Sequence, residues 1–315
     1  MPLLYNNFVK KGETIEKFPC IFSDDFCGIM GEILQRRRRL TERQKRMALV
    51  NDLTGFGRCS IAAALPIISA LRVQACPLPT AILSVHTGFP SHYIDDYTAR
   101  MRPYMENWKE NGLTFDGIST GFIGSAQQIG IVIDFIDMFR TEETLVMVDP
   151  VMGDNGRLYS SYTEEMCREM RRLLAYADVV TPNLTECCEL LGRPYPEGGR
   201  VTTEELSEMA EALIEKGPSQ VVITGLCEGN TVQNFIMEKG RAPLIVSTEK
   251  VGGDRSGTGD VFAAIVAGSL VRGESLPDAV KKAADFIHKV LEYTVALDLP
   301  WDWGLAFEEY LTELK

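Results

Sequence analysis

Histidine is scarce in this chain, and its cysteines are not paired at short spacing. There are only three histidines, His86, His92 and His288, and none of the eight cysteines belongs to a C-x-x-C motif. Zinc sites are commonly built from such motifs together with histidine. The pattern therefore excludes a zinc-finger protein and favours reduced, buried thiols, from which we expect a cytoplasmic protein.

Positive charge and long apolar runs are lacking too. The 315 residues carry 32 Lys and Arg against 44 Asp and Glu, a formal net charge of −12. Nucleic-acid affinity comes mainly from clustered basic side chains, so we expect no nucleic-acid partner. No stretch approaches the roughly 20 apolar residues that span a bilayer, and the N-terminus lacks the basic-then-apolar order of a signal peptide. The expected partner is a small molecule rather than a membrane.

Three common nucleotide-binding signatures are missing. The chain has no G-x-x-x-x-G-K-[ST] motif of the P-loop proteins and no protein-kinase signature. A dinucleotide-binding motif could begin at Gly55 and Gly57, but Ser60 replaces the third glycine, and no Asp or Glu lies between Leu53 and Ile94. That motif needs an acid about 20 residues on to hold a ribose. A nicotinamide-dependent oxidoreductase is therefore disfavoured.

The beginning of the chain differs from the remainder. It leads into the basic run QRRRRLTERQKR at residues 35–46, which has no apolar face and predicts a solvated helix or tail. A natural start at Met47 is the alternative. We divide the chain into an N-terminal extension of unknown role, residues 1–44, and one domain, residues 45–315, which is long enough to bury a sizeable core.

Beyond the extension, short apolar runs alternate with longer segments of helical periodicity. The runs expected to be strands are Met47–Val50, Ala81–Ser84, Gly117–Thr120, Leu145–Asp149, Asp178–Thr181 and Val221–Thr224. This alternation predicts an α/β fold with a mostly parallel central sheet and helices on both faces. Ligands of such open sheets bind beyond the carboxyl ends of the strands, which is where we expect the chemistry.

Two helices have clear boundary signals. Thr202 and Glu205 have the spacing of a capping box, at the start of a helix that we expect to stop at Gly217. Another helix is expected after Ser275 as its N-cap, with Pro277 in the first turn.

A glycine-rich loop, GGDRSGTGD, leads directly into the apolar helical segment VFAAIVAG. Unpaired amides and the macrodipole make a helix N-terminus an anion site, and glycine lets an oxygen approach closely. Asp260 at this junction is well placed to accept a proton from an attacking hydroxyl, while the amides of residues 257–259 stabilise a transferred phosphoryl group. The loop therefore indicates phosphoryl transfer. The alternative is a tight turn with Asp260 as a simple N-cap.

In combination, the motifs resemble the ribokinase-like superfamily. In chain order they are NDLTGFGRCS, LSVHTGF, TGFIGSAQQ, VDPVMGDNG, TPNLTECCEL, VVITG and SGTGDVFAA. GTGD is shared across that superfamily, DPVMGD with TPN narrows the match to vitamin kinases, and HTGF with TGFIGS favours the pyridoxal and pyridoxamine kinases. The resemblance covers roughly residues 45–300. It implies a ribokinase-like three-layer sandwich, and a homodimer, because related enzymes are commonly dimeric.

The resemblance also implies roles for single residues. Asp260 would be the base that activates the substrate, with Gly257, Thr258 and Gly259 as the anion hole. The positions expected to contact ATP are Asp149, Thr181, Asn183, Thr224, Gly257 and Gly259. The positions expected to bind the substrate are Asn51, His86, Thr87, Phe122 and Asp260. The expected metal positions are Asp149, Asp154 and Glu186, with Mg²⁺ beside ATP and a monovalent cation such as K⁺ as a further candidate.

Several positions depart from typical pyridoxal kinases. Asn51-Asp52 stands where a Ser-His pair is typical, Val85 replaces an asparagine, and Phe122 replaces a common tyrosine. Asp52 is similar instead to hydroxymethylpyrimidine kinases. We expect ATP-dependent phosphorylation of the hydroxymethyl group of pyridoxal, pyridoxamine or pyridoxine in vitamin B6 salvage. The alternatives are a hydroxymethylpyrimidine kinase of the thiamine pathway and a non-catalytic protein that binds pyridoxal phosphate.

Overall fold

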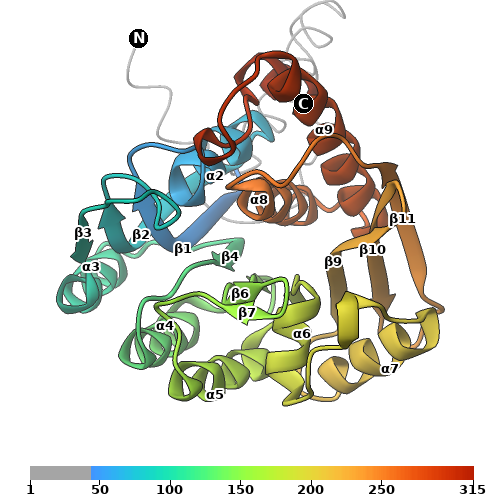
Figure 1. Ribbon diagram of the computed structural model, residues 1–315. Coiled ribbons are helices and arrows are strands. Elements are labelled where there is room, and N and C mark those ends of the chain that lie inside the picture. The colour runs from blue at the N-terminus through green and yellow to red at the C-terminus, as the bar shows by residue number, and fades with distance from the viewer. Residues whose placement is uncertain (1–43) are drawn as a thin grey trace, which may run out of the picture. The chain divides into compact units, whose positions relative to one another are not determined.

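In residues 44–315, which the computed structural model describes, nine strands form one sheet in the order β11-β10-β9-β8-β5-β4-β1-β2-β3 (Figure 1). The strands are β1 (Arg46–Thr54), β2 (Gln74–Leu83), β3 (Ile94–Asp96), β4 (Gly117–Thr120), β5 (Leu145–Val148), β8 (Val179–Val180), β9 (Gln220–Glu228), β10 (Thr231–Glu238) and β11 (Leu244–Glu249). Neighbouring strands run parallel from β2 to β9, and only the pairs β2·β3, β9·β10 and β10·β11 of this described sheet are antiparallel. The structure confirms the predicted mostly parallel sheet.

Each of the six predicted strands is present, but some of their ends differ. β2 starts at Gln74 rather than at Ala81, and β8 is shorter than its apolar run. The sequence pattern does not predict β3 and β11, which lie at the two edges of the sheet, or β10, which lies next to β11. Edge strands do not have to be apolar on both faces, and β11 leaves Leu244 and Ile245 exposed.

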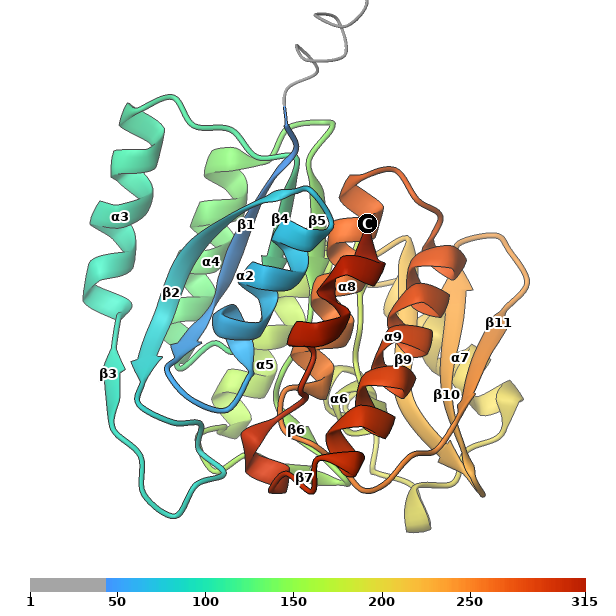
Figure 2. The same ribbon diagram turned by 90° about the horizontal axis from the view of Figure 1, so that it is seen from above.

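Helices cover both faces of the sheet (Figure 2). One layer contains α2 (Ser60–Ala70), α8 (Thr258–Val271) and α9 (Leu276–Ala296), and the other contains α3 (Thr98–Glu110), α4 (Ala126–Phe139), α5 (Glu164–Leu173), α6 (Leu184–Leu191) and α7 (Thr203–Ile214). Residues of β1 alternate between the two cores: Met47 and Leu49 share one with α2, α8 and α9, whereas Ala48 and Val50 share the other with α3–α7. The expected three-layer sandwich is confirmed.

Both predicted helix starts agree with the structure, whereas α7 ends at Ile214, three residues before the expected stop at Gly217. Thr202 and Glu205 form a reciprocal capping box at the start of α7. The hydroxyl of Ser275 accepts the backbone N–H of Asp278 at the start of α9, with Pro277 in the first turn. Short 3₁₀ turns complete the fold: η1 (Leu174–Tyr176), η2 (Glu197–Gly199), η3 (Trp301–Trp303) and η4 (Glu308–Leu314).

The parallel strands bring the predicted site residues together at the carboxyl ends of the central strands. Asn51 lies near the carboxyl end of β1, Phe122 comes shortly after β4, Asp149 follows β5 and Thr181 follows β8. Asp260 in the first turn of α8 contacts Asn51, so the N-terminus of this helix lies at the same end of the strands. The fold therefore forms a site where open α/β sheets generally bind ligands.

The predicted N-terminal extension lies outside the described residues except for Gln44. The described residues Gln44–Lys315 make one compact unit. Within this unit, no helix has both the length and the apolar character needed to cross a membrane. The expected homodimer stays a prediction, because one chain is described. The expected cytoplasmic location stays a prediction too.

Candidate active site

The glycine loop ends at Gly257, which holds the N-cap position of α8 in a left-handed conformation with φ 77°. A Cβ at this position would lie 2.2 Å from the carbonyl oxygen of Arg58. Both facts require glycine. Asp260 is the third residue of the helix and not its cap, so the alternative reading of Asp260 as a simple N-cap is wrong. The first-turn amides of α8 have no acceptor one turn earlier in the helix, which favours anion binding there. The N–H of Thr258 donates to the carbonyl of Arg255 at 3.4 Å, a long bond that an anion would have to replace.

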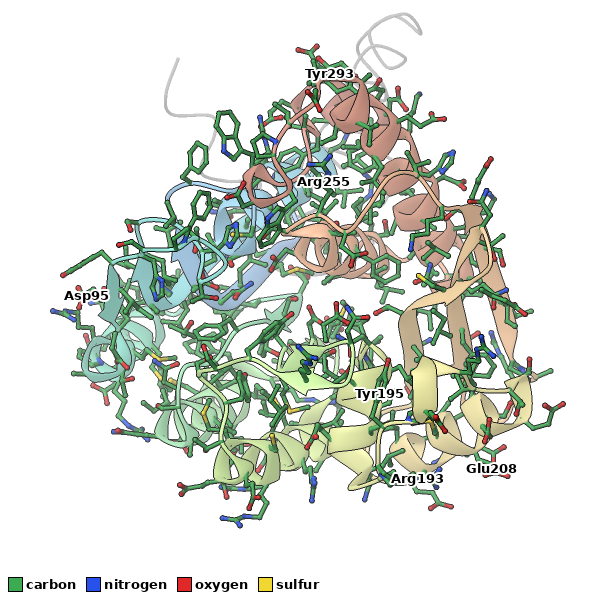
Figure 3. All side chains as sticks on the ribbon, viewed as in Figure 1. Asp95, Arg193, Tyr195, Glu208, Arg255 and Tyr293 are labelled. Carbon is green, nitrogen blue, oxygen red and sulfur yellow. The ribbon has the colours of Figure 1, made fainter. Side chains whose placement is uncertain are left out.

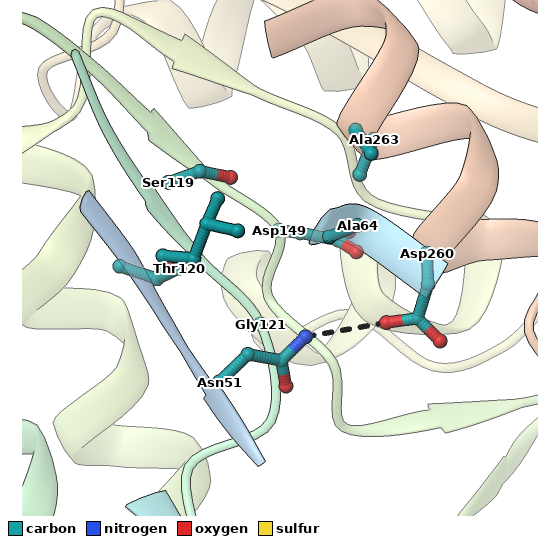
Figure 4. Close-up of a pocket in the computed structure, with 10 residues that line it drawn as sticks. Asn51, Ala64, Ser119, Thr120, Gly121, Asp149, Asp260 and Ala263 are labelled. Atoms are coloured by element: carbon teal, nitrogen blue, oxygen red, sulfur yellow. Dashed lines mark hydrogen bonds between the residues drawn. The ribbon is translucent and has the colours of Figure 1, made fainter. Parts of the chain in front are cut away.

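Asn51 and Asp260 are joined by a hydrogen bond, drawn in Figure 4. Asn51 Nδ2 donates to Asp260 Oδ1 over 3.2 Å. The amide oxygen of Asn51 accepts the backbone N–H of Phe122 at 2.7 Å and that of Asp52 at 2.9 Å. These two bonds fix the side-chain amide so that its nitrogen faces the carboxylate.

Gly121 makes this position of Asn51 possible. A Cβ on Gly121 would lie 2.3 Å from Asn51 Nδ2, far inside contact distance. Glycine is therefore required here for close approach rather than for backbone freedom. Sequence reasoning did not identify Gly121, although its place directly after a predicted strand was a usable signal.

The surroundings of Asp260 raise its pKa to about 6. Burial is the largest cause, and the charge of Asp52 acts in the same direction. The backbone N–H of Ser60 and the amide of Asn51 lower the pKa by hydrogen bonding to the carboxylate. The group is therefore ionised at neutral pH and basic enough to accept a proton in a transition state.

Asp149 lines the same small cavity, of about 20 Å³, as Asn51 and Asp260 (Figure 4). Ala263 and Ala264 of α8 also line it. Asp149 Oδ1 accepts the hydroxyl of Thr181 at 3.0 Å. Burial and then the charge of Asp260 raise the pKa of Asp149. Two neighbouring carboxylates repel each other when both are ionised, and a bound cation would reduce that repulsion.

The predicted ATP and metal residues around α6 are held by backbone contacts. Asn183 and Glu186 form a capping box, and the second oxygen of Glu186 accepts the N–H of Met152 at 3.1 Å. Asn183 Nδ2 donates to the carbonyl of Gly153 at 2.8 Å. Burial, followed by the charge of Asp149, raises the pKa of Glu186 well above its usual range. Thr224 pairs with Asn183 in a parallel bridge, which brings β9 to the same place.

Asp154 lies at the exposed end of the hairpin formed by β6 (Gly153–Asp154) and β7 (Arg157–Leu158). Both of its oxygens accept bonds from Asn155, at 2.8 Å and 3.2 Å. Among residues 44–315, no three His, Cys, Asp or Glu side chains are gathered to hold a metal by themselves. Mg²⁺ beside nucleotide phosphates needs only one or two carboxylates, and Asp149 with its raised pKa fits that need. The three metal assignments stay predictions.

On the predicted substrate side, Phe122 and His86 are partly buried and Thr87 is exposed. The Phe122 ring packs edge-to-face on Tyr162, and its backbone is held by Asn51. His86 Nε2 lies 2.8 Å from the carbonyl of Asp302, so this ring is bonded within the protein. The structure brings Phe122 into contact with Asn51, which in turn contacts Asp260, and the substrate contacts of all these residues stay predictions.

Asp52, the residue that departs from pyridoxal kinases, does not face an open space. It is 4% exposed, and its Oδ2 accepts the hydroxyl of Thr54 at 2.6 Å. Burial is the main cause that raises the pKa of Asp52. Its carboxylate is therefore bonded within the segment that leads from β1 to α2, next to Asp260, and is not free to bind a substrate.

Known proteins resemble this chain over most of its length. The profile of the phosphomethylpyrimidine kinase family matches residues 57–299. A protein of Bacteroides thetaiotaomicron, assigned to the phosphomethylpyrimidine kinases and crystallised with pyridoxal, is 40% identical, with a TM-score of 0.83 and a match over 86% of this chain and 96% of that chain. The pyridoxal kinase of Corynebacterium diphtheriae is 25% identical over 259 residues, 79% of this chain and 89% of the relative.

A more distant structure shares the fold. The pyridoxal kinase of Leishmania donovani, solved with ADP and pyridoxamine, is 22% identical, has a TM-score of 0.78 and matches 86% of this chain and 95% of that chain. The family profile spans more than half of this sequence and includes the start of α8 with its GTGD element. The chain therefore belongs to the phosphomethylpyrimidine kinase family of ribokinase-like kinases, and the proteins it resembles within that fold include pyridoxal kinases.

Proposed function

We propose that the protein phosphorylates the hydroxymethyl group of pyridoxal, pyridoxamine or pyridoxine with ATP. The observation that carries this proposal is the orientation of Asp260 by Asn51 beside the N-terminus of α8. A base next to the N-terminal amides of a helix suits transfer of a phosphoryl group to a hydroxyl. A protein that only bound a phosphorylated vitamer would have no use for a carboxylate at the anion site.

In the proposed reaction, the substrate's hydroxymethyl oxygen attacks the γ-phosphorus of ATP. Its proton passes to Asp260, the new O–P bond forms, and the bond to the β-phosphate bridging oxygen breaks to release ADP. Amides at residues 257–259 stabilise the negative charge on the transferred group. Catalysis in such reactions is mostly positioning and charge stabilisation, which agrees with a base whose orientation is fixed by Asn51.

ATP is proposed to lie along the ends of β5, β8 and β9. Asp149, Thr181, Asn183 and Thr224 meet there, and the Leishmania donovani relative holds ADP in the same fold. Mg²⁺, when bound with ATP, neutralises phosphate charge. Asp149 is the residue that we propose to face that cation, with Glu186 holding the surrounding backbone and Asp154 at the rim.

Hydroxymethylpyrimidine is the second candidate substrate, because the family profile is named for the kinase of its phosphorylated form, phosphomethylpyrimidine. A B6 vitamer is favoured by the 40% identical relative crystallised with pyridoxal. Asp52 does not separate the two candidates, since its carboxylate is bonded to Thr54. The partly buried Phe122 ring offers a flat face to either aromatic substrate.

The test is a coupled ADP-release assay with ATP and Mg²⁺, in which pyridoxal, pyridoxamine, pyridoxine and hydroxymethylpyrimidine are offered separately. The proposal predicts the highest kcat/KM for a B6 vitamer. Turnover of hydroxymethylpyrimidine alone would contradict the proposal and support the second candidate function. Binding of pyridoxal phosphate without any turnover would instead support a non-catalytic protein.

A further inference from the structure

Residues 299–303 connect the end of α9 to the final turns of the chain and contact the loop before α8. The carbonyl of Leu299 accepts a bond from the guanidinium of Arg255, which is labelled in Figure 3. The carbonyl of Trp301 accepts the backbone N–H of Ser256 at 3.2 Å. This loop, residues 252–257, carries the cap and the first amides of the proposed anion hole. Two consecutive residues of the loop are thus bonded to the 299–303 segment.

The same segment is bonded to two further loops of the site. His86 Nε2 lies 2.8 Å from the carbonyl of Asp302, and Arg58 Nη1 donates to the carbonyl of Trp303 at 3.1 Å. His86 belongs to the HTGF loop after β2, and Arg58 to the loop between β1 and α2. Four carbonyls of one short segment therefore receive donors from three loops that are far apart in the sequence.

Steric contacts show how closely these parts approach. A Cβ on Gly88, in the HTGF loop, would lie 2.7 Å from the ring of Trp301. A Cβ on Gly304 would lie 2.3 Å from the carbonyl oxygen of Gly57. The segment and the loops are in direct van der Waals contact, so a displacement of the segment would move the loops as well.

The hydrogen bonds of His86 indicate which nitrogen of the neutral ring carries the proton. Its Nδ1 accepts the backbone N–H of Gly88 at 3.1 Å, so this nitrogen carries no proton. In the neutral ring the proton is then on Nε2, which donates to the Asp302 carbonyl. Neither ring nitrogen is left for a substrate. His86 is therefore placed to connect the HTGF loop to the 299–303 segment rather than to read the substrate directly.

We propose that His86 is a positioning residue that acts at a distance on the anion hole. Through Asp302 it fixes the 299–303 segment, and through Trp301 this segment fixes Ser256 in the loop before α8. The HTGF loop and the anion-hole loop then hold each other in place, so a ligand that orders one favours the binding geometry of the other. The functions given to the two loops depend on the proposed kinase activity, whereas the connection itself does not.

The decisive experiment needs no substrate. It compares amide hydrogen exchange of the full chain in the wild type, His86→Phe and His86→Gln. Phenylalanine keeps an aromatic ring but loses both hydrogen bonds, and glutamine keeps a side-chain N–H donor. We expect exchange at Ser256 and in residues 299–303 to become about threefold faster or more in His86→Phe and to stay near the wild-type rate in His86→Gln.

Phe89→Leu is the matched control, because Phe89 packs on the His86 ring at 4.8 Å between centroids and no bond of its side chain reaches the described 299–303 segment. This variant should leave exchange at Ser256 unchanged. Faster exchange confined to the HTGF loop in His86→Phe, or an equal effect of Phe89→Leu at Ser256, would overturn the proposal. Neither outcome would bear on the kinase assignment.

A second measurement relates the connection to ligand binding. Calorimetric titration with pyridoxal, with and without Mg²⁺ and a non-hydrolysable ATP analogue, gives the factor by which one ligand changes the affinity for the other. The expected factor is about fivefold or more in the wild type and close to one in His86→Phe. An undiminished factor in His86→Phe would contradict a positioning role.

Discussion

Asn51 Nδ2 and Asp260 Oδ1 lie 3.2 Å apart although the two residues are separated by 209 positions in the chain. The contact joins β1 to the first turn of α8 and sets the direction in which the carboxylate faces. Because the amide oxygen of Asn51 is held by the N–H groups of Asp52 and Phe122, a rotated amide would lose both bonds. The base is therefore oriented before any ligand arrives.

The pH dependence of activity should report the ionisation of Asp260. Its pKa is raised from 3.8 to about 6, mainly by burial, and a base must be unprotonated to act. We expect kcat/KM to fall about tenfold per pH unit below about pH 6 and to level off above it. A pH–rate profile with pyridoxal measures this limb. A profile that stays flat down to about pH 4 would show that the group is not the base.

Replacing Asn51 separates orientation of the base from substrate contact. Asn51→Leu removes the amide that lowers the pKa of Asp260, so the acidic limb should move to higher pH and kcat should fall roughly tenfold. The measurement is again a pH–rate profile, with kcat and KM resolved. An unchanged limb with only a raised KM would mean that Asn51 binds substrate and does not orient the base.

Gly121→Ala should disturb the site through Asn51 alone. The added Cβ would meet the Asn51 amide at 2.3 Å, so the amide must move away from Asp260, and we expect a loss of about 10–100-fold in kcat/KM. Gly130→Ala in α4 is the matched control, because its Cβ would meet no atom within 4 Å. The control should keep full activity and be slightly more stable. Equal activity of the two variants would remove the argument for a required close approach.

Asp149 should make the ligand-free protein less stable at high pH. Its pKa in the folded protein lies above the unfolded value of 3.8, so the folded state retains a proton that the unfolded chain has lost. The contribution to stability is full below about pH 4 and declines as the pH rises through the folded pKa. Asp149→Asn should therefore raise Tm by roughly 2–6 °C at pH 8, have little effect at pH 4, and lower activity. A lower Tm for the variant at pH 8, measured without ligands, would contradict this account.

Much of the fold and site could be inferred from residue patterns because the central strands are buried on both faces. The apolar runs ending at Thr120 and Asp149 mark two such strands, and the GTGD element marks the start of α8. The edge strand β11 could not be found in this way, because its exposed Leu244 and Ile245 follow no burial pattern. Secondary structure is a local property, whereas sheet edges are set by the whole topology.

The fine geometry of the site depends on contacts that no local pattern encodes. The sequence motif predicts that His86 binds the substrate, which stays a prediction. Its bond to Asp302 could not be inferred from the motif, because it depends on how the end of the chain folds back. Likewise, the need for glycine at position 121 arises only when Asn51 is in place. Chemistry carried by one short motif, such as the base in GTGD, was accessible from the sequence, and chemistry assembled from distant segments was not.

The central claim is that Asp260 takes the proton of a hydroxymethyl group during phosphoryl transfer. Its most direct test measures turnover of pyridoxal by the wild type and by Asp260→Asn, together with the Kd for pyridoxal of both. The account predicts that kcat falls roughly 10²–10⁴-fold in the variant while Kd changes by no more than a few fold. A variant that keeps kcat within about tenfold of the wild type, with pyridoxal still bound, would contradict it.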